Sequence, residues 1–405
     1  MMGTHLHAER VRALAADFQT RFGNPPELFV SSPGRIEVCG NHCDHQNGCV
    51  VAAAVDADNL AAVSRSGDEY VRVVSPGHRE IVLSLSDLTK QKEETGHSPA
   101  IVRGIAAALV TRDIPVCGIN VLTNSHVPAG SGLSSSAAFE NLITLAFLEA
   151  AESELPVGEI ARIGQYSENE YYGKPSGLMD QMASAVGGLI FIDFKTPEAL
   201  RIEKSGSGLL KQNINICITN TGGSHAGLTG EYGAIPLEMK KVAEFFGKKV
   251  LREVREEEFC DRLAALREYA GDRAVLRAMH FFDENKRAAE CRDALNANDR
   301  DLFLDVIRRS GESSWKYLQN IYPSGSTGLQ EQAIGLALSE KILAGKGAWR
   351  IHGGGFAGTI QAFVPDELLE RYTSEMIGIF GPDTCLALTL RDEGVCIYRS
   401  EHEDQ

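Results

Sequence analysis

Residues 39–49 read CGNHCDHQNGC and place three cysteines, two histidines and one aspartate within eleven positions. These side chains could coordinate a metal ion, or the histidine and aspartate could hydrogen-bond a polar ligand. A structural zinc site needs four ligands that converge tetrahedrally, usually from two separated pairs. The cysteines and histidines here are too crowded to converge without severe folding of the backbone. The spacing therefore argues against zinc and leaves open what His42 and Asp44 bind.

A glycine- and serine-rich segment, PAGSGLSSSAA at residues 128–138, lies between a predicted strand and a predicted helix. Glycines permit close backbone approaches, and the free N–H groups of a helix N-terminus attract anions. A flexible turn with a serine N-cap is the simpler alternative. The combination of strand, spaced glycines, serines and helix favours phosphate binding. The predicted phosphate-binding residues are Gly130, Ser131, Gly132, Leu133, Ser134, Ser135 and Ser136.

This segment differs from two common nucleotide-binding loops. No G-x4-G-K-[ST] motif occurs in the chain. A G-x-G-x-x-G fingerprint with an acidic partner after the next strand is also absent. Neither a P-loop nor a dinucleotide site is therefore predicted.

Two further segments carry side chains suited to a polar site. Residues 167–181, SENEYYGKPSGLMDQ, contain Glu168, Glu170 and Asp180. Small and apolar residues follow Asp180 and predict that it is partly buried, and a buried carboxylate needs a partner or a chemical role. A helix N-cap or a surface acid is the alternative. Residues 353–358, GGGFAG, form either a tight turn or a space for a ligand.

The elements that would position these residues mix strands and helices without strict alternation, which favours an α+β fold over a doubly wound sheet. Residues 28–31 and 36–39 read as two strands broken by a turn at 32–35. Residues 137–152 read as a helix, and the pattern is mostly helical over 236–318.

We place a domain boundary near residue 200, which gives an N-terminal domain of residues 1–200 and a C-terminal domain of residues 201–405. The first domain would contain the polar cluster and the phosphate loop. The last stretch, residues 386–405, either stays with the second domain or returns to pack on the first.

Composition restricts the class of protein. The chain has 405 residues, of which 43% are hydrophobic and 23% charged, as in ordinary soluble enzymes. The net charge of −15 argues against nucleic acid as a partner. Nine cysteines, an odd number, favour reduced thiols in the cytoplasm. No apolar run is long enough to span a bilayer, and the N-terminus reads as an amphipathic helix with Val11, Leu14 and Phe18 on one face.

Taken in order, these segments resemble the motifs of the GHMP small-molecule kinases, and most closely those of galactokinases. The galactokinase motif PGRVNLIGEHTDYNxG is similar to residues 33–48, and PxGxGLSSSAS is similar to residues 128–138. The motifs AENxFxG, GIMDQ, SEY and GGGFGG are similar to residues 167–173, 177–181, 230–232 and 353–358. The resemblance covers nearly the whole chain. It implies the GHMP kinase fold, with two domains and the active site in the cleft between them.

The resemblance also implies the reaction, which is phosphoryl transfer from ATP to the C1 hydroxyl of a hexose, most simply galactose. Asp180 takes the position of the catalytic aspartate, and Arg35 that of the arginine beside it. Mg²⁺ would be held by Ser136 and Glu168, with Glu170 as the competing acid. The partners would be the sugar and ATP, without nucleic acid or membrane, and the protein would act as a monomer or weak homo-oligomer.

The resemblance assigns the sugar-binding positions to Asn41, His42, Asp44 and Tyr232. A core aromatic is the alternative interpretation of Tyr232. The cysteines of residues 39–49 then become small apolar fillers.

Several positions depart from the galactokinase pattern, namely Glu37, Asn41, Cys43 and His45. Asn41 replaces a glutamate that the family uses at the C6 hydroxyl. The loss of that charge would suit a sugar with a carboxylate at C6, such as galacturonate, or galactose with a looser fit. A catalytically silent sensor of sugar and ATP, or a mevalonate-type kinase, is a further alternative. The presence of Arg35 and Asp180 argues against the first, and Tyr232 against the second.

Overall fold

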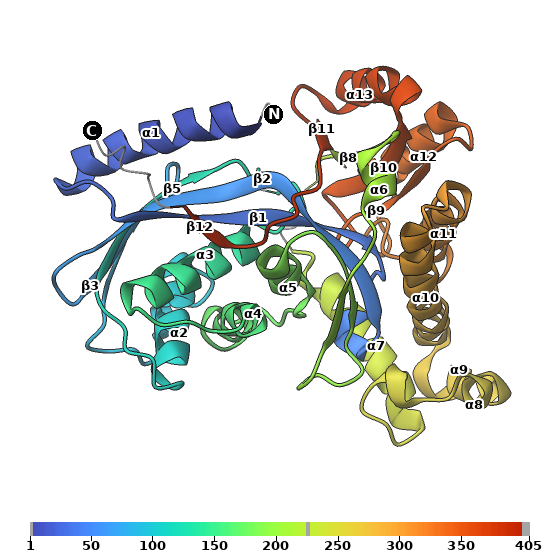
Figure 1. The fold of residues 1–405 in the computed structure, drawn as a ribbon. Helices are drawn as coiled ribbons and strands as arrows, with labels where there is room; N and C mark the ends of the chain where they lie inside the picture. The colour runs from blue at the N-terminus through green and yellow to red at the C-terminus, as the bar shows by residue number, and fades with distance from the viewer. Residues whose placement is uncertain (1–2, 129, 224–226, 399–405) are drawn as a thin grey trace.

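The computed structural model describes residues 3–128, 130–223 and 227–398, and it arranges them as two β-sheets surrounded by helices (Figure 1). Within these residues the larger sheet has the order β12-β1-β2-β5-β3-β4, and β6 pairs with β2 and β7. Its strands are β1 (Leu28–Cys39), β2 (Cys49–Arg65), β3 (Tyr70–Val74), β4 (Ile81–Ser84), β5 (Ile119–Ser125), β6 (Leu189–Asp193), β7 (Arg201–Lys204) and β12 (Cys396–Tyr398). The smaller sheet has the order β11-β8-β10-β9, with β8 (Ile214–Asn220), β9 (Ala348–Ile351), β10 (Thr359–Pro365) and β11 (Cys385–Leu388).

The helices fall into two groups along the chain, one before residue 187 and one after residue 207. The first group is α1 (Gly3–Phe22), α2 (Ser98–Val110), α3 (Ser135–Ala150), α4 (Val157–Tyr166) and α5 (Met179–Val186). The second group is α6 (Gly208–Lys211), α7 (Thr229–Phe245), α8 (Glu256–Asp261), α9 (Leu263–Ala270), α10 (Asp272–Ala297), α11 (Arg300–Ser313), α12 (Glu331–Leu343) and α13 (Asp366–Phe380). Short 3₁₀ turns are η1 (Asp44–Gln46), η2 (Lys92–Glu94) and η4 (Leu251–Glu253), and π-helical turns are η3 (Ser167–Tyr172) and η5 (Ser314–Leu318).

Strand β1 runs without a break through the segment for which the sequence predicted a turn, so that prediction was wrong. The pairing with β2 continues across Pro33 and shifts register between Pro33 and Arg35. Proline has no N–H for the ladder and is therefore tolerated at such a bulge. A side chain at Gly34 would meet the carbonyl oxygen of Leu133 at 3.1 Å, so glycine lets the phosphate loop approach β1 here.

The larger sheet is covered on both faces (Figure 1). The amphipathic face predicted for the N-terminal segment is confirmed, because Leu14 and Phe18 of α1 pack on Phe29 and Leu60 of the sheet. Apolar residues of α2, α3 and α4 cover the opposite face. Burial on both sides explains why β2 is a nearly continuous run of small and β-branched residues.

The two sheets share one apolar core. Ile36 and Val51 of the larger sheet belong to the same buried cluster as Ile218 and Phe363 of the smaller sheet. The chain leaves the larger sheet after β7 and enters the smaller sheet at β8. It returns at its end, where β12 pairs with the start of β1. No helix in the described part of the chain combines the length and apolarity required to cross a membrane.

Candidate active site

Arg35 of β1 and Asp180 of α5 form a two-point contact across the sequence. Nε of Arg35 donates to Oδ1 of Asp180 at 2.7 Å, and Nη2 donates to Oδ2 at 2.6 Å. The Arg35 side chain is 7% exposed, whereas that of Asp180 is 30% exposed. Burial opposes ionisation of Asp180, but Arg35 and the hydroxyl of Ser134 outweigh it and lower the pKa to about 2. Asp180 is therefore an ionised carboxylate that remains open to a ligand.

The glycine- and serine-rich loop joins this pair directly. Ser134 has a left-handed backbone with φ of 59°, and its hydroxyl donates to Oδ2 of Asp180 at 2.6 Å. It therefore does not cap α3, which was the simpler interpretation of the serines. Ser135 and Ser136 are exposed at the start of the 16-residue helix α3. The free N–H groups of that helix end remain available to an anion.

Contacts from both halves of the chain hold the loop in place. Its Gly132 carbonyl accepts hydrogen bonds from Nη1 of Arg35 and, at 3.1 Å, from Nε2 of His352. Gly132 has φ of 73°, and a Cβ there would lie 2.3 Å from Oγ1 of Thr359. Glycine is therefore required by both conformation and space.

The remaining loop residues are positioned by local bonds. The Ser131 hydroxyl donates to the carbonyl of Pro128 at 2.6 Å, and the Leu133 side chain is buried. Gly130 also has a positive φ, of 73°, without a close neighbour. Residues 130–134 of the loop are thus held by hydrogen bonds, burial and backbone conformation.

The polar cluster of residues 39–49 forms a wall beside Arg35 and Asp180. Both ring nitrogens of His42 are hydrogen-bonded. Nδ1 lies 3.2 Å from Nε2 of His45, and Nε2 lies 3.1 Å from the Gly354 carbonyl oxygen. Burial lowers the pKa of His42 to about 4, so its ring is neutral at neutral pH. The carbonyl can only accept, which makes Nε2 of His42 the donor and Nδ1 the acceptor from His45. A neutral histidine pair with defined tautomers therefore lines the wall.

Asp44 is half-buried, and among the described residues its carboxylate accepts one hydrogen bond, from the amide of His45 to Oδ1 at 2.8 Å. Burial and the negative charge of Asp180 raise the pKa of Asp44 to about 7. A Cβ at Gly177 would lie 1.8 Å from Oδ2 of Asp44, so the turn before α5 packs directly on this carboxyl. Asp44 and Asp180 thus face the same region from β1–β2 and from α5.

Asn41 is buried and fully engaged within the protein. Its Nδ2 lies 3.1 Å from Oε1 of Glu37 and 2.8 Å from the Gly353 carbonyl. Its Oδ1 accepts from Nδ2 of Asn320 at 3.0 Å. Glu37 also pairs with Arg350 at 2.6 Å. The structure therefore places Asn41 behind the glycine loop, with its donors used by protein atoms.

Tyr232 of α7 supports the same glycine loop. Its hydroxyl donates to the Gly355 carbonyl at 2.8 Å, and its ring meets Phe356 edge-on at 5.3 Å between centroids. A Cβ at Gly354 would lie 2.7 Å from the Tyr232 ring, so the consecutive glycines allow the tyrosine to approach. Residues 353–358 therefore form a loop against the wall, in which Gly354 and Gly355 allow close packing and Gly353 faces open space.

A second group of carboxylates lies around Gln181, the residue that follows Asp180 in α5. Nε2 of Gln181 donates to Glu140 of α3 at 2.9 Å and to Glu168 of η3 at 3.1 Å. Lys174 donates to the other oxygen of Glu168 at 2.8 Å. Burial raises the pKa of Glu140 well above its usual value, and one of its oxygens has no partner among the described residues.

This group fits a magnesium ion better than a zinc ion. Ser136 precedes Glu140 by one helical turn on α3, so the two lie on the same face. Gln181 bonds both Glu140 and Glu168, which brings Glu168 against α3, the helix that begins with Ser135 and Ser136. One carboxylate and one hydroxyl, with phosphates and waters, form a usual Mg²⁺ environment. Glu170 is exposed, and no cluster of three His, Cys, Asp or Glu ligands occurs in the described ranges.

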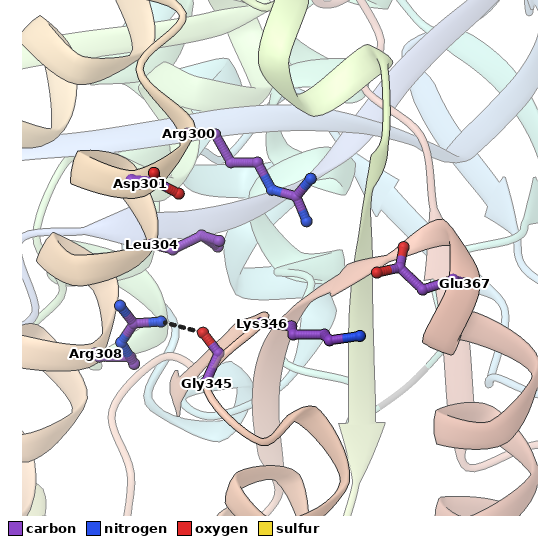
Figure 2. Close-up of a pocket in the computed structure, with 7 residues that line it drawn as sticks. All are labelled: Arg300, Asp301, Leu304, Arg308, Gly345, Lys346 and Glu367. Carbon is purple, nitrogen blue, oxygen red and sulfur yellow. Dashed lines mark hydrogen bonds between the residues drawn. The ribbon is translucent and has the colours of Figure 1, made fainter.

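A separate hollow of about 430 Å³ lies between the start of α11, the 344–347 turn and the start of α13 (Figure 2). Arg300 and Lys346 point into it from one side, and Glu367 from the other. Arg308 is held at its rim by the Gly345 carbonyl, at 3.1 Å. None of the residues predicted for the site lines this hollow.

The structure adds site residues that sequence reasoning left without a role: Glu37, Glu140, Lys174, Gln181, Asn320, Arg350 and His352. Lys174 stands within the acidic segment 167–181. A lysine among acidic residues could therefore have been predicted to form an ion pair. Asn320 and Arg350 are far from their partners in sequence and carried no such signal.

Comparisons with known proteins match most of the chain. The GHMP kinases N-terminal domain model matches residues 100–188, and the galactokinase galactose-binding signature matches residues 16–65. Galactokinases of Glaesserella parasuis and Actinobacillus pleuropneumoniae are 31% and 32% identical over 361 residues, which are 87% of this chain and 89% of each relative.

Solved structures share the fold. A Lactococcus lactis galactokinase complexed with galactose matches 95% of this chain and 99% of its own, with a TM-score of 0.82 and 23% identity. A Methanococcus jannaschii mevalonate kinase matches 90% of this chain and 98% of its own, with a TM-score of 0.64 and 15% identity. The predicted α+β fold is confirmed.

Proposed function

The chain belongs to the galactokinase family of GHMP kinases, as its motifs predicted, and from that premise we propose that it transfers the γ-phosphoryl group of ATP to the C1 hydroxyl of galactose. The observation that supports this most directly is the contact of Arg35, Asp180 and Ser134. It joins a candidate proton acceptor, a fixed positive charge and the start of a phosphate loop at one point.

Asp180 is the proposed catalytic base. Its pKa of about 2 keeps the carboxylate ionised at neutral pH, and its partial exposure leaves it room to accept from a sugar hydroxyl. A carboxylate of such low basicity orients the hydroxyl first. It takes the proton late, once the attacking oxygen has gained phosphoryl character and become acidic. This timing suits a loose transition state, in which little activation of the nucleophile is needed.

Arg35 and the loop would handle the phosphates. The guanidinium stays charged at any working pH and stabilises negative charge that develops on the transferring group. The loop residues 130–136 and the N-terminus of α3 supply N–H and hydroxyl donors for the ATP phosphates. Ser136 and Glu168 would hold Mg²⁺, which neutralises phosphate charge when bound.

Among the four proposed sugar-binding residues, Asp44 has acceptor capacity to spare, because one oxygen receives a single protein hydrogen bond. We propose it as the main acceptor of sugar hydroxyls. Asn41, His42 and Tyr232 are bonded to the carbonyls of Gly353, Gly354 and Gly355, respectively. Their proposed contribution is to shape the wall against which the sugar lies.

An ATP-consumption assay with galactose, galacturonate, N-acetylgalactosamine and arabinose tests the proposal. We expect turnover with galactose and product phosphorylated at C1, as read by phosphorus NMR. Preferred turnover of galacturonate would keep the kinase chemistry and replace the substrate. ATP binding without turnover of any of these sugars would contradict the proposal in favour of a silent sensor. We also propose that the protein acts in the cytoplasm as a monomer or weak homo-oligomer, since all nine cysteines are free thiols.

A further inference from the structure

Lys174 stands where the chain turns from η3 toward α5. The amides of Gly173 and Lys174 both donate to the carbonyl oxygen of Glu168, at 3.0 and 3.1 Å. Gly173 has φ of 90°, a conformation that favours glycine. This turn folds Lys174 back over Glu168, where its ammonium meets the carboxylate at 2.8 Å.

The two partners of this ion pair have different surroundings. The Lys174 side chain is 57% exposed, whereas that of Glu168 is 4% exposed. An ammonium carries three N–H donors, and Glu168 is the one described side chain to which Lys174 donates. Lys174 therefore has N–H donors that Glu168 does not use.

Arg35, the other cation beside Asp180, has fewer N–H donors available for a ligand. Its Nε and Nη2 are used by Asp180, and its Nη1 by the Gly132 carbonyl. Three or more charged phosphate oxygens need several cationic or N–H donors at once. Lys174 is thus placed to supply positive charge that Arg35 alone does not.

The position of the pair points to phosphates rather than to the sugar. Glu168 is tied through Gln181 to Glu140 of α3, one turn after Ser136. Lys174 accordingly lies beside the helix end at which we expect ATP phosphates. The wall residues His42 and Asp44 have other partners, namely the Gly354 carbonyl and the amide of His45.

We propose that Lys174 is a phosphate-contacting residue of this kinase. In the nucleotide-free protein its ammonium neutralises Glu168, and it turns to the outer phosphates of ATP when the nucleotide binds. The inference rests on the proposed function, because it requires ATP at the 130–136 loop. It assigns a catalytic contact to a residue outside the glycine- and serine-rich loop.

Equilibrium binding of ATP and AMP in the presence of EDTA isolates this contact from the metal. Isothermal titration calorimetry would compare the wild type with Lys174→Met and Lys174→Arg. Lys316→Met is the matched control, since Lys316 is 61% exposed and forms one ion pair at 2.7 Å with Glu312. A charge-assisted hydrogen bond corresponds to a factor of about 10 or more in affinity.

We expect Lys174→Met to weaken ATP binding by about tenfold or more and to leave AMP binding unchanged. Lys174→Arg should retain most of the ATP affinity, and Lys316→Met all of it. Equal weakening of ATP and AMP would overturn the inference, because it indicates a displaced loop. Unchanged ATP affinity, or no ATP binding by the wild type in EDTA, would also overturn it.

Two further measurements keep the test decisive. Lys174→Gln removes the charge but keeps a polar side chain, and it replaces the methionine variant if circular dichroism shows that the latter is misfolded. Titration of the wild type with ATP and Mg²⁺ tests the premise separately. Absence of binding there would contradict the proposed function itself rather than the role of Lys174.

Discussion

Strand β1 contributes to two arginine–carboxylate pairs with the same contact distance and opposite surroundings. Arg35 meets Asp180 at 2.6 Å, and Glu37, two residues further along β1, meets Arg350 at 2.6 Å. The carboxylate of the first pair is 30% exposed, and that of the second is 5% exposed beside a fully buried arginine. The first pair can therefore exchange a protein contact for a ligand, whereas the second cannot.

The difference shows that burial, rather than the chemistry of the pair, separates a reacting group from a scaffold. The buried pair of Glu37 and Arg350, called the sealed pair below, also contacts the backbone. Nη1 of Arg350 donates to the carbonyls of Glu37 and Val38 at 3.1 and 2.9 Å. It thereby joins β1 to β9 of the smaller sheet. The more exposed pair of Arg35 and Asp180, called the open pair below, therefore includes a residue of a strand whose position is already fixed.

The largest effect should come from Asp180→Asn, which disables the open pair. Without a proton acceptor, turnover should fall by a factor of about a thousand. The shift of the Asp180 pKa from 3.8 to about 2 corresponds to about 2 kcal/mol, so the loss of stability should be small in comparison. Steady-state kinetics and urea unfolding measure the two quantities. Near-normal turnover would show that Asp180 is not the base.

Arg350→Met should break the sealed pair with the opposite balance. It leaves Glu37 buried without its countercharge, which costs about 3–5 kcal/mol of unfolding free energy. Urea unfolding of the single variants Glu37→Met and Arg350→Met and of their double variant measures the coupling. We expect the double variant to lose clearly less than the sum of the two singles.

If the stability losses of the two single variants simply add, Glu37 and Arg350 do not stabilise each other. The comparison with Arg35 and Asp180 would then fail. The double variant Arg35→Met/Asp180→Met provides the contrast. It should remain inactive however stable it is, since its pair serves the reaction.

The smallest effect concerns Asp44, a carboxyl beside the open pair that forms no ion pair with a described residue. Its folded pKa of about 7 lies above the unfolded value of about 4, so the unfolded chain releases the proton first. Stability should therefore fall as pH rises through this window. Between pH 6 and pH 7 the wild type should lose about 1 kcal/mol relative to Asp44→Asn.

Urea unfolding of both proteins at several pH values measures this difference. Parallel stability profiles for the wild type and Asp44→Asn would show that Asp44 ionises normally. In that case the region around Asp180 would be more open to water than the distances indicate.

The sequence predicted the open site better than the sealed one. Arg35, Ser134 and Asp180 belong to contiguous motifs, and the structure brings all three into contact. Their neighbours within a motif fix much of their surroundings. The function of such a site follows from residue types that chemistry strictly requires.

The sealed cluster depends on the tertiary arrangement, which a single sequence does not display. Glu37 and Arg350 lie at opposite ends of the chain, and Asn320 follows a π-helical turn without any motif. Asn41 was predicted to face the sugar from its place in a motif, yet its side chain bonds Glu37 and the Gly353 carbonyl. The turn predicted at residues 32–35 was wrong because of a tertiary contact as well. A proline–glycine pair usually marks a turn, but pairing with β2 keeps this one extended.

The pairing of β12 with β1 has a consequence for synthesis of the protein. Phe29 and Ser31, near the beginning of the chain, receive their outer strand from Tyr398 and Cys396. On the ribosome, β1 must therefore wait with an unpaired edge until almost all of the chain has emerged. Unpaired edges invite association with other chains. The strand that carries Arg35 and Glu37 thus depends on protection of its edge, for instance by chaperones, until β12 has been made.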